Sequence, residues 1–367
     1  MPKEIKNNEF RVGLVPGSVR EYVAHGHEVT VETGAGAGIR ASDADYEAAG
    51  ATIAPDAATV FRNAELIVKV KEPQPAEYAR LREGQILYTY LHLAPDPEQT
   101  RGLLKSGVTG VAYETVTDDF GGLPLLAPMS EVAGRLSIQA AAHVLTAPQG
   151  GRGLLMGGVP GVLPAKVLII GGGVVGMHAA RMASGLGADV TILDRNQHRL
   201  AQLDDLFAGR VKTRYSTFDA LDEETDAADV VIGAVLIPGA SAPKLLTRDM
   251  LKGMKDGAVL VDVSIDQGGC FETSHPTTHA QPTYVVEGVV HYCVANMPGS
   301  VPLTSSHALN NATLRYGLAL ADKGAQALKE NKHLLNGLNV HRGKVTHRAV
   351  AEALGLEYTP PGEALGR

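Results

Sequence analysis

The sequence has little cysteine and no tryptophan. Its two cysteines, Cys270 and Cys293, belong to no CxxC motif and no Cys/His cluster. A disulfide framework is therefore excluded, no metal site is indicated, and a reducing compartment such as the cytoplasm is the simplest setting. The lack of tryptophan, together with 42 glycines, indicates an aliphatic core and many tight turns.

The sequence also lacks an excess of basic charge and a long uninterrupted apolar run. The formal net charge is −7 and the pI is about 6.0, which weighs against nucleic acid as a partner. The most apolar region, residues 154–177, is broken by Pro160, Pro164 and Lys166, so it does not predict a membrane-spanning helix. The charged start, MPKEIKNNEFR, does not resemble a secretory signal. We therefore expect a soluble cytoplasmic protein without a membrane partner.

The chain is long enough for two domains, since 367 residues exceed the size at which one core keeps growing. Short apolar runs alternate with helical patterns, which predicts an α/β fold with mostly parallel sheets. A first series of strands is expected at 27–34, 64–71, 85–92 and 107–116. A second series is expected at 166–170, 188–194, 211–216, 229–236, 257–266 and 291–297.

A longer helix is expected to connect the two series, with Ser130 as its N-cap. After residue 300 the remaining sequence reads as helix and loop, too little for a domain of its own. We expect it to pack back onto the first domain and make that domain discontinuous. The prediction is two Rossmann-like domains, one of residues 1–128 and 305–367 and the other of residues 129–304.

A glycine turn, KVLIIGGGVVGMHAA, lies between a predicted strand and a predicted helix. Its GxGxxG glycines are Gly171, Gly173 and Gly176. In a dinucleotide-binding turn the first permits the tight bend, the second admits the pyrophosphate, and the third lets the helix pack on the strand. The alternative is a helix-packing turn without a ligand. The spacing to the next strand end favours the dinucleotide.

That next strand ends at Asp194, which is 18 residues after Gly176. A carboxylate there accepts hydrogen bonds from the ribose of NAD and repels the additional phosphate of NADP. Arg195 and Arg199 lie close by and could instead accommodate that phosphate, so the choice between NAD and NADP stays open. Asp194 could also be an ordinary surface residue.

Polar residues at strand ends are the candidates for chemistry, because ligands of parallel sheets bind there. Lys71 could bind a carboxylate or polarise a carbonyl, or it could be a solvated lysine. His92 could transfer protons near neutral pH, or be a structural histidine between two leucines. Arg11 could bind an anionic substrate through its planar fork, or form a surface salt bridge.

The strand GAVLVDVSID contributes two carboxylates. Asp266 precedes Gln-Gly-Gly, a loop suited to the rim of a binding site. Asp262 lies on the same face of the strand, two pleats earlier, and we predict that it is a buried hydrogen-bonding residue. Spacing alone does not bring these candidates together with those of the first domain.

Long ungapped segments carry a family resemblance. The chain resembles the family that contains alanine dehydrogenase and the NAD-binding part of pyridine nucleotide transhydrogenases. The segments are PKEIKNNEFRV (2–12), KVKEP (69–73), LHLA (91–94), APMSEVAGRL (127–136), GGRGLLMGGVPGV (150–162), GGGVVG (171–176), VIGAVLIPGA (231–240), VLVDVSIDQGGCFE (259–272) and CVANMPGSVP (293–302). They span nearly the whole chain.

The resemblance implies NAD-dependent, reversible oxidative deamination of L-alanine to pyruvate and ammonium. It implies that Arg11 and Lys71 bind the substrate and that His92 and Asp266 act as acid and base. Residues 1–128 and 305–367 would then form the substrate domain, and 129–304 the NAD-binding domain. The implied cofactor-binding residues are Ser130, Gly171, Gly173, Val174, Val175, Gly176, Asp194, Arg199, Ser216, Val235, Leu236, Ile265, Asp266, Asn296 and Met297. The resemblance implies no metal. It does imply a homo-oligomer, namely a hexamer.

One departure and several alternatives accompany the resemblance. Family members usually begin with a short apolar strand before PKE, whereas here Met1 leads directly into Pro2. The alternatives are an NAD-binding transhydrogenase subunit, a non-catalytic NAD-binding protein, and a dehydrogenase of a larger amino acid. Lys71 and His92 argue against the transhydrogenase, which needs no such pair. The several matched polar positions argue against a non-catalytic protein, and the alanine-type segments argue against a larger substrate.

Overall fold

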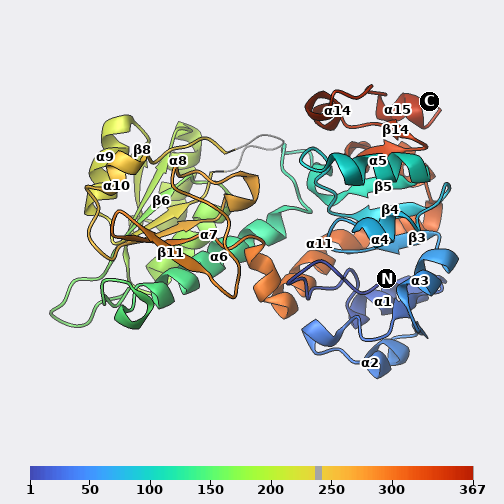
Figure 1. Cartoon of the computed structure of the whole chain (residues 1–367), viewed down its shortest axis with the longest axis horizontal. Coiled ribbons are helices and arrows are strands. Elements are labelled where there is room, and N and C mark those ends of the chain that lie inside the picture. Colours follow the sequence, from blue (N-terminus) through green and yellow to red (C-terminus); the bar gives the residue numbers. More distant parts are fainter. Residues whose placement is uncertain (236–241, 367) are drawn as a thin grey trace. The chain divides into compact units, whose positions relative to one another are not determined.

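The computed structural model describes residues 1–235 and 242–366, and they form two compact units (Figure 1). Unit 1 consists of Met1–Met129 and Gly299–Arg367, and unit 2 of Ser130–Pro298. Both contain mostly parallel sheets with helices, so the predicted α/β class is confirmed. Within the described ranges, no helix is both long and apolar enough to cross a membrane.

Unit 1 is built on a five-stranded sheet with the order β14-β13-β5-β4-β3. Its strands are β3 (Leu66–Val68), β4 (Ile86–Thr89), β5 (Thr109–Ala112), β13 (Leu338–His341) and β14 (Lys344–Val345). The first three are parallel, and β13 and β14 are antiparallel additions from the C-terminal part. Every residue of β4 and β5 is buried, which explains why these strands read as continuous apolar runs.

A smaller sheet of unit 1 pairs β1 (Thr30–Glu32) with β2 (Thr52–Ala54). The start of the chain lies along β1, because the backbone N of Met1 donates to the Thr30 carbonyl at 2.6 Å and the Met1 carbonyl accepts from Glu32 N at 3.0 Å. The helices of unit 1 are α1 (Pro16–Ala24), α2 (Asp43–Ala48), α3 (Ala57–Asn63), α4 (Pro75–Tyr78), α5 (Pro97–Ser106), α11 (Pro302–Lys323), α12 (Gln326–Glu330), α13 (Lys332–Asn336), α14 (Arg348–Leu354) and α15 (Pro361–Ala364).

Unit 2 contains a seven-stranded sheet with the order β11-β12-β10-β9-β6-β7-β8. Its strands are β6 (Lys166–Ile170), β7 (Asp189–Asp194), β8 (Lys212–Tyr215), β9 (Val230–Gly233), β10 (Val259–Asp262), β11 (Thr283–Val286) and β12 (Val289–Tyr292). All pairs are parallel except β11 with β12. Counted from β6, the parallel strands follow the order 3-2-1-4-5-6 of the dinucleotide-binding doubly wound fold.

Helices cover both faces of the unit 2 sheet. They are α6 (Ala127–Val144), α7 (Val174–Gly185), α8 (Gln197–Phe207), α9 (Phe218–Ala227) and α10 (Arg248–Leu251). Because side chains of a strand alternate, Val167 and Ile169 of β6 pack in one apolar cluster, with α6, α7 and α8. Leu168 and Ile170 pack in the opposite cluster, with α9 and α10.

Three expectations from the sequence were wrong. The strand predicted at 291–297 lies instead at β12, which forms a hairpin with β11 through Glu287 and Gly288, both with positive φ. The region after residue 300 is not purely helical, since β13 and β14 form a second hairpin through Arg342 and Gly343, again both with positive φ. Such two-residue turns suit hairpins, but Glu and Arg are unusual residues for the left-handed conformation. Ser130 is not an N-cap, because α6 already begins at Ala127.

Candidate active site

Arg11 of unit 1 is buried, with 2% of its surface exposed, so a surface salt bridge does not describe it. Its Nε and Nη2 bond the two carboxylate oxygens of Glu9 at 2.7 and 2.5 Å, and its Nη1 lies 3.0 Å from Sδ of Met129. Burial opposes the charge of Arg11, but the hydrogen bonds and charge of Glu9 outweigh it, so the pKa of Arg11 lies above its ordinary value. The guanidinium is therefore a fixed, permanent cation.

The backbone that carries Arg11 is held by α11, from the far end of the sequence. Val12 N donates to Ser306 Oγ at 3.1 Å, and Val15 N donates to Asn310 Oδ1 at 2.9 Å. These side chains accept hydrogen bonds from backbone N–H groups that have no partner in a neighbouring strand. The C-terminal helix thus fixes the segment that contains Arg11.

A buried ionic cluster lies beside Lys71. Lys69 is fully buried and pairs with Glu77 at 2.7 Å and with Glu4 at 3.1 Å. The other oxygen of Glu4 accepts from Val70 N at 2.7 Å. Burial raises the pKa of Glu4, although the charge of Lys69 opposes this, and the pKa of Lys69 is raised by its two carboxylates despite burial. The cluster fixes the end of β3 that leads to Lys71.

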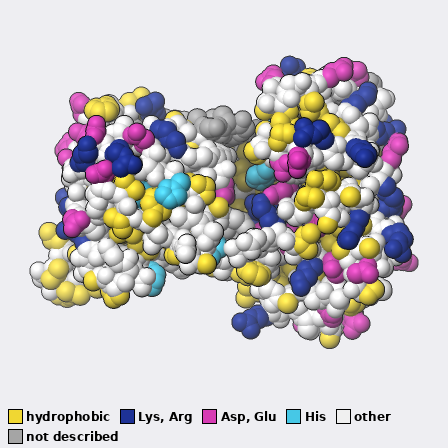
Figure 2. Space-filling model, in the orientation of Figure 1, with side chains coloured by type: hydrophobic (Ala, Val, Ile, Leu, Met, Phe, Trp, Pro, Cys, Tyr) yellow, Lys and Arg dark blue, Asp and Glu magenta, His cyan; other side chains and the backbone are white. Residues whose placement is uncertain are grey.

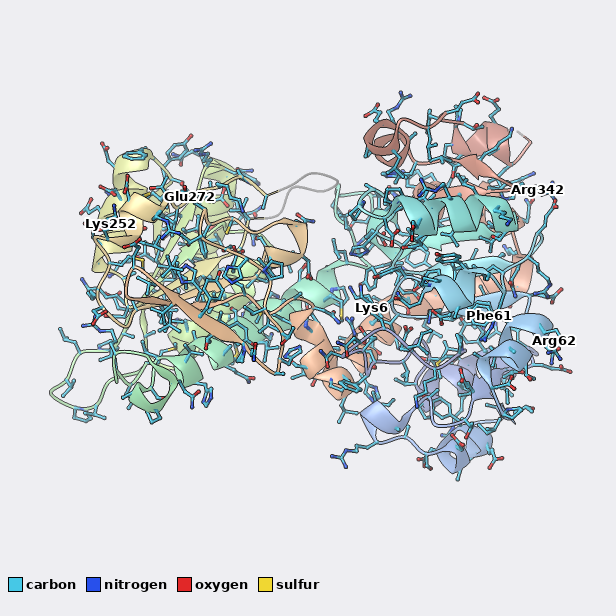
Figure 3. The ribbon with its side chains drawn as sticks, viewed as in Figure 1. Lys6, Phe61, Arg62, Lys252, Glu272 and Arg342 are labelled. Atoms are coloured by element: carbon cyan, nitrogen blue, oxygen red, sulfur yellow. The ribbon has the colours of Figure 1, made fainter. Side chains whose placement is uncertain are left out.

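Lys71 itself is partly exposed and follows β3. Its carbonyl accepts from Thr89 Oγ1 at 3.0 Å, which ties it to the end of β4. The next residue, Glu72, pairs with Lys6, which is labelled in Figure 3. Burial raises the pKa of Glu72, but the charges of Lys71 and Lys6 outweigh it and leave that pKa below its ordinary value. Lys71 therefore lies among fixed charges on an ordered segment.

His92 lies beyond β4 rather than within it, in a left-handed conformation with φ of 50°. Its side chain is 42% exposed, and its Nδ1 is 3.5 Å from Oε1 of Glu114. The same oxygen accepts from the His92 backbone N at 2.7 Å, and both Glu114 oxygens accept from Leu91 N. The ring also packs edge-on against Tyr90, with centroids 5.8 Å apart.

Glu114 is a residue that the sequence reasoning missed. It follows β5, which is the parallel neighbour of β4, so its side chain lies at the same edge of the sheet as residues that follow β4. Its carboxylate holds the backbone of His92 in a conformation that a non-glycine residue seldom adopts. The signal was available: a carboxylate near the end of the predicted strand at 107–116.

The glycine turn of unit 2 lies between β6 and α7, as predicted. Gly171 has φ of +103°, which requires glycine. A Cβ on Gly176 would lie 1.8 Å from the Gly171 carbonyl oxygen, so glycine is needed for close packing of α7 on β6. A Cβ on Gly173 would meet nothing within 4 Å. Gly173 therefore serves no packing role within the described protein and borders open space.

Asp194 and Arg199 both contact the middle of this turn. Asp194 Oδ2 accepts from Gly172 N at 2.7 Å, and Oδ1 accepts from Asn196 N at 2.8 Å. Arg199 Nε donates to the Gly172 carbonyl at 2.6 Å. Ser216 follows β8, and its N donates to the Asp194 carbonyl at 3.0 Å. These three predicted cofactor residues and the glycine turn thus form one connected group.

A second connected group follows β9 and β10. Asp266 is exposed, and its carboxylate accepts from Asn296 N at 3.1 and 3.3 Å. The Val235 carbonyl accepts from Ser264 Oγ at 2.7 Å, directly before Ile265.

The remaining predicted cofactor residues differ in accessibility. Val175, Ile265 and Met297 are largely buried, Val174 is 38% exposed, and Ser130 lies partly exposed inside α6. Leu236 lies outside the described residues. Among the residues that are described, no group of three or more His, Cys, Asp or Glu could hold a metal ion.

Comparison with known families decides what this arrangement belongs to. Residues 1–133 match the family model Alanine dehydrogenase/PNT, N-terminal domain, and residues 137–348 match Alanine dehydrogenase/PNT, C-terminal domain. The chain belongs to the alanine dehydrogenase/PNT family.

Three relatives sharpen the assignment within this family. The chain is 63% identical to an alanine dehydrogenase of Halomonas elongata over 367 residues, with 100% of this chain and 99% of the relative covered. A solved structure of an L-alanine dehydrogenase is 53% identical with a TM-score of 0.94, covering 96% of this chain and 98% of that one. A transhydrogenase from Sinorhizobium meliloti is 27% identical with a TM-score of 0.81, covering 95% and 98%.

These relatives confirm the predicted family and type of enzyme, an alanine-dehydrogenase-type oxidoreductase that uses a pyridine nucleotide and acts on small molecules. They favour this prediction over the transhydrogenase alternative, because the identity to the transhydrogenase is about half as high.

Proposed function

We propose that the protein catalyses the reversible, NAD-dependent oxidative deamination of L-alanine. L-alanine, NAD and water give pyruvate, ammonium, NADH and one proton. The observation that carries the proposal is the set of ionisable side chains on ordered segments of unit 1, namely Arg11, Lys71 and His92. A protein that only bound NAD, or that passed hydride to another nucleotide, has no need of this set. The high identity to alanine dehydrogenases over the whole chain supports the same substrate.

The residues of unit 2 fit NAD. Gly173 borders open space, and α7 starts at the next residue, so its free N–H groups and its dipole attract a pyrophosphate. The Asp194 carboxylate accepts hydrogen bonds from ribose hydroxyls and disfavours a phosphate there, which favours NAD over NADP. Bound NAD supplies the hydride acceptor.

The cations of unit 1 bind the substrate in this proposal. Arg11 keeps its charge because Glu9 compensates for burial, and its planar guanidinium suits a carboxylate. Lys71 provides a second cation, which stabilises the negative charge on the carboxylate of alanine or the carbonyl oxygen of pyruvate. Because both lie on segments fixed by buried contacts, little ordering is required when substrate binds.

His92 and Asp266 move the protons. After Cα of alanine has lost hydride, the iminium carbon takes up water, and the resulting carbinolamine loses ammonia. The first step needs a base that removes a proton from water, and the second needs an acid that protonates the leaving nitrogen. We assign these roles to His92 and to Asp266 of unit 2, whose carboxylate is the second proton-transfer group. Glu114 is a positioning residue, since it holds the His92 backbone and lies beside its ring.

The proposal assigns a separate task to each of two domains. Residues 1–128 with 305–367 form the substrate domain, and residues 129–304 form the NAD-binding domain. We also propose that the protein is cytoplasmic, consistent with its two unpaired, buried cysteines, Cys270 and Cys293.

An exposed apolar loop supports a homo-oligomer, with a hexamer implied by family resemblance. In the loop after α6, Leu155, Val159, Val162 and Leu163 are 64, 53, 57 and 83% exposed. Figure 2 shows hydrophobic side chains at the lower left, where Figure 1 draws this loop in green. Contiguous apolar surface of this kind marks protein contacts. Light scattering of the wild type and of Leu163→Ser tests whether the loop holds copies together.

The test of the proposed reaction is alanine-dependent formation of NADH by the purified protein. We expect His92→Asn to lower turnover by about 10²–10⁴-fold, with NADH binding unchanged. The matched control is His25→Asn, since His25 is another exposed histidine of unit 1, and its ring pairs with the carboxylate of Asp322. Near-normal turnover of His92→Asn removes His92 from the mechanism. NADH binding without alanine turnover by the wild type contradicts the proposal itself.

A further inference from the structure

Asp262 ends β10 and lies four residues before the proposed proton-transfer residue Asp266. Its side chain is fully buried, as the sequence predicted. Oδ1 accepts from Ser264 N at 3.0 Å, and Oδ2 accepts from Cys270 N at 2.9 Å and from Ser274 Oγ at 2.5 Å. One carboxylate therefore bonds both ends of the loop 264–270 and a third segment at residue 274.

The backbone of this loop packs closely against Asp262. Gly268 and Gly269 follow a turn of 3-10 helix and have φ of +88° and +75°. A Cβ on Gly269 would lie 2.7 Å from Asp262 Oδ2. On the outer side, Lys244 Nζ donates to the carbonyls of Gly268 and Gly269 at 2.6 and 2.9 Å. The carboxylate and the loop backbone are thus fitted to each other.

The loop carries groups that the proposed reaction uses. Asp266 lies in the middle of it, with its carboxylate bonded to Asn296 N. Ser264, whose N–H bonds Asp262, also donates its hydroxyl to the Val235 carbonyl. Hydrogen bonds therefore connect Asp262 to the loop that carries Asp266 and, through Ser264, to the segment after β9.

We propose that Asp262 is a positioning residue, which sets the place of Asp266 by holding both ends of the loop between them. This inference rests on the proposed function, because it assumes that Asp266 takes part in the reaction. A purely structural role is the alternative. The two differ in their kinetics, since a positioning residue acts on turnover through Asp266 and a structural residue does not.

The experiment compares Asp262→Asn with Asp249→Asn, an exposed aspartate of unit 2 whose side chain is 87% exposed. Asparagine keeps the volume of the side chain but replaces one carboxylate oxygen by an NH₂ group. That group cannot accept the hydrogen bonds that the oxygen accepts in the wild type. We expect Asp262→Asn to lower kcat about 100-fold, as for a misplacement of about 1 Å. KM for alanine is expected to stay within about threefold, since Arg11 and Lys71 are unchanged. Asp249→Asn is expected to match the wild type.

The double variant Asp262→Asn/Asp266→Asn separates the two roles. If Asp262 acts through Asp266, the double variant should have nearly the same kcat as Asp266→Asn alone. Independent, multiplying effects overturn the inference in favour of a structural role. An unchanged kcat for Asp266→Asn contradicts the proposed function at that residue, whereas a low kcat for Asp266→Asn with a normal kcat for Asp262→Asn overturns only the positioning role.

A milder variant covers the case in which Asp262→Asn does not fold. Ser274→Ala removes one donor to Asp262 and leaves the loop sequence intact. We expect kcat to fall about 3–10-fold, since one hydrogen bond to Asp262 is lost. We also expect the buried thiol of Cys270 to react faster with a thiol reagent as the loop loosens. Wild-type kcat and wild-type thiol reactivity in Ser274→Ala overturn the inference.

Discussion

The two units hold their candidate residues by different means. In unit 1, buried ions do so: Arg11 is fixed by Glu9, and the approach to Lys71 is fixed by Lys69 with Glu4 and Glu77. In unit 2, backbone groups and glycines do so, and even the buried Asp262 accepts only from neutral donors.

The difference follows from what each unit is proposed to bind. A small amino acid offers few atoms, so its carboxylate must meet cations whose places are already fixed. A dinucleotide is long, and its phosphates can be bound by N–H groups at a helix start, provided that no side chain blocks the approach. The candidate residues of unit 1 are therefore held by paired buried charges. Those of unit 2 are held by hydrogen bonds to backbone groups and by glycines that leave room for the ligand. Each prediction below tests one half of this comparison.

The largest expected effect is alkaline unfolding of unit 1. Burial raises the pKa of five of its tyrosines above the ordinary value of 10.0, namely Tyr22, Tyr46, Tyr88, Tyr90 and Tyr113. Above pH 10 the unfolded chain releases these protons and the folded unit does not, so stability falls as pH rises. The protein has no tryptophan, so phenolate absorbance is measured without interference.

We expect the absorbance of these phenolates to appear together with the loss of circular dichroism. The stability of unit 2 should also fall as pH rises, since burial raises the pKa of Tyr284, Tyr292, Cys270 and Cys293, but these are fewer groups than in unit 1. Complete ionisation of all tyrosines near pH 10 in a folded protein contradicts the prediction.

Removal of the central cation of unit 1 is the next largest effect. In Lys69→Met, Glu4 and Glu77 stay buried without their cation, and we expect the free energy of unfolding in urea to fall by about 3–5 kcal/mol. Neutralising both carboxylates as well, in Lys69→Met/Glu4→Gln/Glu77→Gln, should restore much of the loss.

The matched control is Lys332→Met, also in unit 1, where the lysine is 75% exposed and pairs with Asp119. An exposed pair contributes at most about 1 kcal/mol, so this variant should be nearly as stable as the wild type. Equal losses for Lys69→Met and Lys332→Met would show that the buried cluster has no special part in unit 1.

The sequence predicted well those elements whose signals are local. The strands β6 and β7 and the glycine turn between β6 and α7 lay where expected, because strands buried on both faces read as apolar runs and GxGxxG has a fixed geometry. The hairpins at Glu287 and Arg342 were missed, because non-glycine residues in the left-handed conformation give no turn signal.

Long-range contacts of the candidate site could not be predicted from spacing. Ser306 and Asn310 support the Arg11 segment from almost 300 positions away, and Glu4 accepts from Val70 N, just after β3, from 66 positions away. In KVKEP, nothing in the sequence distinguishes the buried Lys69 from the partly exposed Lys71, because residues two positions apart share one face of a strand, and both lysines follow β3. The family resemblance, rather than periodicity, selected Lys71.

The smallest expected effects compare two glycines of the same turn. In Gly176→Ala the added methyl group collides with the Gly171 carbonyl, so α7 must move away from β6, and we expect a loss of stability of about 1–3 kcal/mol. In Gly173→Ala the methyl group meets no protein atom, so stability should change by at most about 0.5 kcal/mol.

If a pyrophosphate occupies that open space, however, Gly173→Ala should weaken NAD binding at least about tenfold, or about 1.4 kcal/mol, in calorimetric titration. Thermal unfolding and NAD affinity measured on both variants therefore separate packing from binding. Unchanged NAD affinity in Gly173→Ala would mean that the missing side chain leaves room for something other than the cofactor, and the account of unit 2 would lose its main support.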